Sequence, residues 1–168
     1  MARCFPMAMV TGILFSAAII DAGDWPCYRG PNKNGICSEG IEQWPPVEIW
    51  RASVGQGYSQ VTVSEGRVYT AGWSSTPSNQ DTVYCFDEAS TGTNPTPLWT
   101  QSYACGSISY QGTRATPTVD GNEVYMFSHA GRLSVFNKAN GTPLWNVTAT
   151  SGSTGWGVSE FSADRQCE

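Results

Sequence analysis

The sequence predicts an all-β protein, an incomplete β-propeller that holds about two four-stranded blades plus flanking strands. Two stretches, Val63–Trp99 and Val119–Trp145, repeat one order of short apolar runs and turn residues, and both end in Leu-Trp. Four runs in a unit of roughly 45 residues is the spacing of a propeller blade. The composition, with 18 Gly, 10 Pro and only 14% charged residues, suits turns and strands. An immunoglobulin-like sandwich is the alternative fold, but it does not explain the repeated Trp ending.

Residues 1–22 have the features of a secretory signal peptide. Arg3 supplies a positive start, Phe5–Ile20 is mostly apolar, and Ala22 is a small residue at the expected cleavage point. An uncleaved anchor is the alternative, but the apolar run is short for a membrane span. We therefore expect no stable membrane span after cleavage, and a mature protein in the periplasm or outside the cell.

The rest of the chain divides into three parts. Residues 23–48 form an irregular lead-in segment, and residues 49–155 hold two blades preceded by a closing strand. That strand, Glu48–Val54, carries Trp50 in the place that a Trp occupies in each later unit, so we expect it to end a preceding blade. Residues 156–168 are expected to begin a third blade that is cut short, which predicts that the chain is the front part of a longer protein.

Each blade is expected to contain four strands in chain order. In the first blade these are Gln60–Val63, Arg67–Ala71, Thr82–Phe86 and Leu98–Gln101. In the second blade they are Thr116–Val119, Glu123–Phe127, Leu133–Phe136 and Leu144–Val147.

A polar turn links the third strand to the fourth in each blade, at Asp87–Gly92 and at Asn137–Gly141. Asp or Asn opens such a turn through its side chain, and Gly closes it because Gly tolerates positive φ. The Trp on each outer strand is then expected to dock in the gap between neighbouring blades. These docking residues are Trp50, Trp99 and Trp145.

Six cysteines are present, of which Cys4 lies in the expected signal peptide. Disulfides are permitted in an exported protein, and Cys27 with Cys37 is the expected pair because both flank a turn rich in Gly, Pro and Asn. Cys85 with Cys105 is a second candidate pair, and the alternative is that these are buried thiols. No Cys-x-x-Cys pair occurs and the chain has 1 His, so we expect no metal site.

The repeat endings resemble those of the pyrroloquinoline-quinone (PQQ)-like repeat β-propeller family, in which an Asp-x-x-Thr-Gly turn leads to a Trp that docks between blades. Here the endings run over Phe86–Trp99 and Phe136–Trp145, with Asn137 in place of the turn Asp. The segment Asp24–Gly35 is similar to the start of exported members from planctomycete-type bacteria. The resemblance implies an exported propeller and covers roughly residues 24–159.

The resemblance leaves two classes of function open. The first is a non-catalytic, exported binding or scaffolding module for other blades or proteins, similar to outer-membrane assembly propellers. The second is the N-terminal part of a PQQ-dependent alcohol or sugar dehydrogenase, which would hold PQQ and calcium at the ring centre. The adjacent cysteine pair of many such dehydrogenases is absent and acidic residues do not cluster. We therefore favour the first class, and we expect no catalysis and no cofactor.

Three residues at the ends of innermost strands are expected to face the propeller channel, namely Tyr58, Arg114 and Trp156. Arg114 and Trp156 are candidates to bind an anionic or aromatic ligand. The alternative is that Arg114 pairs with a carboxylate and the aromatic rings fill the channel. His129 is expected to be an exposed turn residue without a catalytic role, and the serines lack a His/Asp partner pattern, which argues against a hydrolase. The net charge of −5 argues against nucleic-acid binding.

Overall fold

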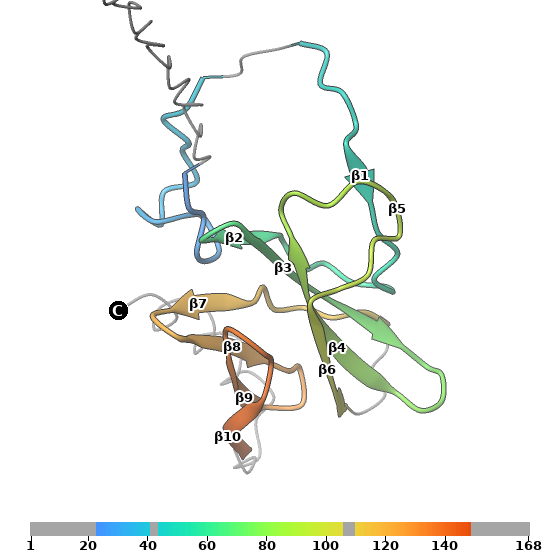
Figure 1. Ribbon diagram of the computed structural model, residues 1–168. Coiled ribbons are helices and arrows are strands. Elements are labelled where there is room, and N and C mark those ends of the chain that lie inside the picture. The colour runs from blue at the N-terminus through green and yellow to red at the C-terminus, as the bar shows by residue number, and fades with distance from the viewer. Residues whose placement is uncertain (1–22, 41–43, 106–109, 149–168) are drawn as a thin grey trace, which may run out of the picture.

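Two four-stranded antiparallel sheets make up most of the protein, and they resemble two successive blades of a β-propeller (Figure 1). The structure is a computed structural model, and it describes residues 23–40, 44–105 and 110–148. Within these ranges every helix or strand assigned is a strand, which confirms the predicted all-β fold. A search of the described residues for a membrane-spanning helix finds none. The expectations that lie outside the described residues are the signal peptide at 1–22, Trp156 and the third blade at 156–168.

The first sheet, called blade 1 here, overlaps all four predicted strands. In order across the sheet it contains β2 (Thr62–Ser64), β3 (Arg67–Ser74), β4 (Gln80–Asp87) and β6 (Trp99–Ala104). β3 and β4 are longer than predicted because their pairing continues until Ser74 lies opposite Gln80. β2 starts later than predicted because the Gln60 amide donates its hydrogen bond to the Thr116 side chain, at 3.0 Å.

The second sheet, called blade 2, has the same strand order. It contains β7 (Thr118–Asp120), β8 (Glu123–Phe127), β9 (Arg132–Asn137) and β10 (Pro143–Thr148). β8 has the predicted bounds, and the other three strands overlap their predicted ranges. The internal repeat read in the sequence therefore corresponds to two sheets of equal topology.

The turns between the third and fourth strands have the expected chemistry. Asp87 Oδ1 accepts a hydrogen bond from the amide two residues later at 2.9 Å, and Asn137 Oδ1 does the same at 2.9 Å. Gly92 and Gly141 have φ values of +77° and +72°. Because the amide oxygen of Asn accepts the same hydrogen bond as the carboxylate of Asp, the substitution at position 137 leaves the turn unchanged.

A short parallel pair joins the strand before blade 1 to the link between β4 and β6. It consists of β1 (Trp50–Arg51) and β5 (Gly92–Thr93). β1 is shorter than the predicted strand, and β5 was not predicted. The Asn94 amide donates to the Arg51 carbonyl at 2.7 Å, and its side-chain oxygen accepts from the backbone that follows β1 at 2.8 Å. The link between β4 and β6 is longer than the corresponding link in blade 2. Its additional residues hold β1 against blade 1.

The lead-in segment is tied to the first strands of both blades. Trp25 forms an antiparallel bridge with Val63 of β2. The amide of Val119, in β7, donates to the carbonyl of Pro26 at 2.8 Å. Main-chain hydrogen bonds therefore fix this irregular segment across two sheets, although it contains no strand of its own.

The expected disulfide between Cys27 and Cys37 is not formed. Cys37 is an exposed free thiol. Cys27 is 1% exposed and disulfide-bonded to a residue other than Cys37. Closeness in the chain was a poor guide because the turn between them places one sulfur in the interior and the other in solvent. Cys85 and Cys105 are buried free thiols, which agrees with the second of the two alternatives for that pair.

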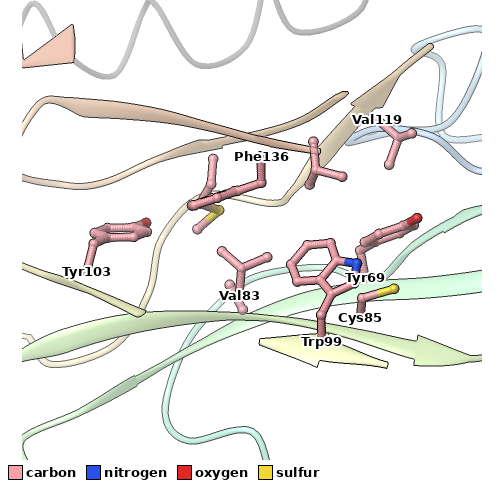
Figure 2. Packing of buried hydrophobic residues seen from close by; sticks show 10 residues of the cluster. Tyr69, Val83, Cys85, Trp99, Tyr103, Val119 and Phe136 are labelled. Carbon is pink, nitrogen blue, oxygen red and sulfur yellow. The ribbon is translucent and has the colours of Figure 1, made fainter. Parts of the chain in front are cut away.

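The hydrophobic core lies between the two blades rather than inside either one. Blade 1 contributes the aromatic rings of Tyr69 and Trp99, and blade 2 contributes Phe136 and Val119 from the opposite side (Figure 2). Each blade thus covers the apolar face of its neighbour. The ten buried members are Tyr69, Ala71, Val83, Cys85, Trp99, Tyr103, Val119, Val124, Met126 and Phe136.

Candidate docking face

Trp99 docks blade 1 onto blade 2. Its indole Nε1 donates to the carbonyl of Lys138, in the turn of blade 2, at 3.0 Å. Its ring lies 5.9 Å from Tyr69 of its own blade and 6.4 Å from Phe136 of the next, measured between ring centroids. Trp99 is only 7% exposed. A Cβ added to Gly141 would lie 2.6 Å from the Trp99 ring, so glycine is required there for close approach as well as for positive φ.

Trp50 makes the equivalent contacts with blade 1. Its Nε1 donates to the carbonyl of Glu88 at 3.3 Å, and its ring centroid lies 5.4 Å from that of Phe86. Phe86 and Glu88 occupy the repeat positions that Phe136 and Lys138 occupy in blade 2. The same docking site, made of a Phe ring and the carbonyl two residues after it, therefore occurs twice in this structure and binds a Trp each time.

Among the described residues, Trp145 makes only the contact that its own blade supplies. Its ring packs edge-on against Tyr125 with the centroids 6.3 Å apart, at the repeat position where Trp99 packs in a tilted arrangement against Tyr69. Trp145 is nevertheless 46% exposed, and Leu144 and Val147 beside it are 45% and 54% exposed. We call Trp145 and Val147 the β10 face, and leave out Leu144 because its repeat counterpart Leu98 is 50% exposed even though Trp99 beside it is covered. It is an apolar surface on the outer strand of blade 2 with the local geometry of a docking strand.

Polar contacts reinforce the covered interface. Arg67 of blade 1 donates from one guanidinium nitrogen to the carbonyls of Lys138 and Ala139, at 2.8 and 3.0 Å. The Lys138 ammonium lies 2.9 Å from the carboxylate of Glu65. Burial raises the pKa of Tyr69 and of the Cys85 thiol, so both groups are neutral at neutral pH. The interface is therefore apolar at its centre and polar at its rim, as stable interfaces are.

Two of the three expected channel residues lie together. The Arg114 guanidinium stands 5.0 Å from the centroid of the Tyr58 ring, a cation–π contact, and donates to the carbonyl of Tyr110 at 2.9 Å. Both tyrosine rings are exposed, at 64% and 73%. Trp156 lies outside the described residues. Within those residues Arg114 makes no ion pair, because the ion pairs there are Arg51–Glu48 and Lys138–Glu65.

Sequence reasoning missed a group of side chains that could hold a metal ion. Asp81, Cys105 and His129 come together with their ligand atoms within 4.8 Å of one another. Burial and the nearby Asp81 carboxylate raise the pKa of Cys105 to about 11, so its thiol is protonated when no cation is bound. No local spacing marks this group, because its members belong to β4, to the end of β6 and to the turn after β8. Only the folded chain brings them together.

The comparisons with known proteins agree with the repeat. Residues 47–164 match the sequence profile of the PQQ-like repeat family described as outer membrane protein assembly factor BamB. No curated protein matches the chain.

Two solved structures are similar in fold. BamB from Moraxella catarrhalis is 16% identical with a TM-score of 0.43, over 63% of this chain and 29% of that one. A europium-containing methanol dehydrogenase is 16% identical with a TM-score of 0.43, over 60% of this chain and 17% of that one. The chain thus spans less than a third of the length of either protein.

Proposed function

Because the chain belongs to the PQQ-like repeat family described as outer membrane protein assembly factor BamB, we propose that it is a non-catalytic propeller module for binding or scaffolding. It binds a partner by docking one blade on another, in the way that Trp99 of blade 1 docks on blade 2. The partner of the β10 face is a further PQQ-like blade, from the same polypeptide or from another protein.

The observation that carries this proposal is the half-made contact at Trp145. Trp50 and Trp99 each meet a Phe ring and donate to a turn carbonyl. Trp145 packs against Tyr125 at the repeat position where Trp99 packs against Tyr69, yet it is 46% exposed. Large aromatic residues that are exposed beside other apolar residues mark interaction surfaces. A blade with a Phe-Asp or Phe-Asn turn offers the complementary ring and carbonyl.

We propose that this module acts in the periplasm or outside the cell. The support is the charged start, apolar run and small residue at 1–22. The exposed pair of Tyr58 and Arg114 is a candidate site for an anionic or aromatic ligand, and Trp156 is expected to be its third member.

The dehydrogenase alternative needs a site for calcium, and the described residues do not fit one. Calcium takes six to eight oxygen ligands. The one cluster of three or more His, Cys, Asp or Glu that these residues form contains a single carboxylate, a thiol and an imidazole. The proposed function therefore involves neither PQQ nor calcium. Reduction of a dye by the full-length protein with PQQ, calcium and an alcohol would overturn the non-catalytic assignment.

Site-specific photo-crosslinking tests the proposed partner. Benzoyl-phenylalanine replaces Trp145 in the protein expressed in its native cell envelope, and the crosslinked peptides are identified by mass spectrometry. The expected crosslink maps to the Phe or the turn of a PQQ-like blade. The matched control carries the same group at Tyr110, which is 73% exposed but outside the β10 face. Crosslinks from position 145 that map only to other kinds of sequence, or that equal those from position 110, would overturn the proposal.

A further inference from the structure

Asp81, Cys105 and His129 form a mixed cluster where the two blades meet. Asp81 belongs to β4 and Cys105 follows β6, so both come from blade 1, whereas His129 lies in the β8–β9 turn of blade 2. Their candidate ligand atoms all lie within 4.8 Å of one another. Asp81 is 1% exposed and Cys105 is 7% exposed, and His129 is partly exposed. The cluster is therefore mostly buried but reachable from solvent on the His129 side.

The cluster adjoins buried polar atoms that lack hydrogen-bond partners. Trp73, Asp81 and Tyr103 lie directly opposite one another on the neighbouring strands β3, β4 and β6, so their side chains share one face of blade 1. Among the described residues Trp73 Nε1, Asp81 Oδ2 and Tyr103 Oη are buried and make no hydrogen bond of good geometry, although the Asp81 carboxylate lies near enough to the Tyr103 hydroxyl to help raise its pKa. A buried carboxylate oxygen without a partner is costly, and such atoms indicate a missing ion or water.

Hydrogen bonds from outside the cluster orient the Asp81 carboxylate and hold the main chain at Cys105 and around His129. Thr113 donates to Asp81 Oδ1 at 2.6 Å, which orients the carboxylate and leaves Oδ2 for another partner. The amide of Cys105 donates to the carbonyl of Asn79 at 3.1 Å. The turn that carries His129 is closed by the hydrogen bond from Gly131 N to Ser128 O, at 3.0 Å. Hydrogen bonds that orient a ligating carboxylate are characteristic of metal sites in proteins.

We propose that Asp81, Cys105 and His129 bind a zinc ion that joins blade 1 to blade 2. Zinc takes thiolate, imidazole and carboxylate ligands at about 2.0–2.3 Å in tetrahedral geometry. Ligand atoms in such a site are separated by less than about 4 Å, so small side-chain rotations close the cluster. Binding displaces the Cys105 thiol proton to solvent. The divalent ion, one thiolate, one carboxylate and a neutral imidazole then sum to zero charge, which suits a buried site.

This set of ligands selects against the hard cations. Calcium and magnesium prefer oxygen ligands alone, whereas a thiolate with an imidazole favours zinc and its neighbours in the first transition row. The fourth position is left for water. A zinc ion bound here couples the end of blade 1 to the His129 turn, and its effect on stability is independent of whether the β10 face docks a blade.

Cobalt(II) substitution and zinc titration test the site. The chain is purified with a tag that contains no histidine, is freed of metal by a chelator, and is titrated with cobalt(II). One equivalent is expected to produce a thiolate-to-cobalt charge-transfer absorption in the near ultraviolet, and zinc is expected to abolish it. Zinc should also raise the thermal unfolding midpoint of the chain, because the ion binds the folded state in preference to the unfolded one.

Three variants decide whether the named residues bind the ion. Cys105→Ser should lose the charge-transfer absorption, and His129→Asn should weaken zinc at least about tenfold. Cys37→Ser removes an exposed free thiol elsewhere and should keep the full signal. His129→Asn alters a partly exposed turn and is expected to keep the fold, checked by circular dichroism, so the test does not depend on the buried cysteine variant. Absence of a one-to-one complex in the parent chain, or equal zinc affinity in His129→Asn, would overturn the proposal and leave water as the partner of Asp81.

Discussion

Trp99 and Trp145 stand at the same position in two copies of one repeat, yet one is buried and the other is half exposed. Trp99 is 7% exposed and Trp145 is 46% exposed. Within its own blade each indole packs on a tyrosine of the second strand, with ring centroids 5.9 Å apart for Trp99 and 6.3 Å apart for Trp145. What differs is the acceptor. Phe136 and the Lys138 carbonyl receive Trp99.

A tryptophan at this repeat position makes two contacts that have different effects. The tyrosine of the same blade orients the indole, and the neighbouring blade removes it from water. Only the second contact buries a large apolar area and satisfies the indole N–H, so it carries most of the stabilisation.

Removal of the indole should be far more costly at the covered interface than at the open face. Trp99→Ala is expected to lower the free energy of unfolding by about 3–5 kcal/mol, because it leaves a cavity between the blades. Trp145→Ala should cost about 1 kcal/mol, since nearly half of the side chain is already in solvent. Urea unfolding followed by circular dichroism measures both. Equal losses would show that Trp99 gains nothing from blade 2.

The two turn glycines should respond differently to alanine. Gly92 and Gly141 have nearly the same φ, +77° and +72°, so the backbone strain of a Cβ is shared. At Gly141 the new Cβ would lie 2.6 Å from the Trp99 ring, and at Gly92 it would meet nothing within 4 Å. Gly141→Ala should therefore cost about 1–3 kcal/mol more than Gly92→Ala in the same unfolding experiment. A difference near zero would mean that the Trp99 ring shifts freely and is not docked.

At the rim of the interface, Arg67 should matter more than the Glu65–Lys138 ion pair. Arg67→Met removes hydrogen bonds to two carbonyls of blade 2, at 2.8 and 3.0 Å, and is expected to cost about 1–2 kcal/mol. Glu65→Gln should cost less than about 1 kcal/mol, because the Glu65 side chain is 71% exposed. When the unfolding is repeated in high salt, the loss of unfolding free energy caused by Glu65→Gln should become smaller, and the loss caused by Arg67→Met should stay the same. A larger loss for Glu65→Gln would place the stabilising contacts in the ion pair instead.

The paired tyrosines should differ in their response to alkali. Burial raises the pKa of Tyr69, whereas the hydrogen bond to Glu123 is the main cause that raises the pKa of Tyr125 to about 12. A raised pKa means that the folded state keeps a proton that the unfolded chain loses. This stability is complete below the ordinary value of 10.0 and is lost as pH rises above it.

Tyr69→Phe should therefore change the unfolding midpoint little at neutral pH and reduce the loss of stability in alkali. Tyr125→Phe, on the open face, should change the alkaline loss by a smaller amount. Urea midpoints at about pH 7 and about pH 12 measure both effects, because the loss at Tyr125 falls behind that at Tyr69 only when the pH reaches the lower of the two folded-state pKa values. An equal alkaline loss in the parent chain and in Tyr69→Phe would contradict the assignment of that loss to the buried interface.

Much of the fold could be read from the sequence because it depends on local and repeated signals. The alternation of apolar runs located both blades, and the Asp87 and Asn137 turns form as their side chains predict. β5 was missed because a two-residue strand at Gly92–Thr93 exists only through its partner β1. The prediction of a Cys27–Cys37 disulfide was wrong, because a short separation in the chain does not determine which sulfur points into the interior.

Hydrophobic period and turn chemistry act over a few residues, so the two four-stranded repeats and the places of Trp99 and Trp145 on their outer strands could be read from the chain alone. The tertiary structure decided which tryptophan is covered, and it brought Asp81, Cys105 and His129 within 4.8 Å of one another. Those outcomes depend on how one sheet packs on the next. Residues far apart in the chain come into contact there, and local sequence patterns do not predict such contacts.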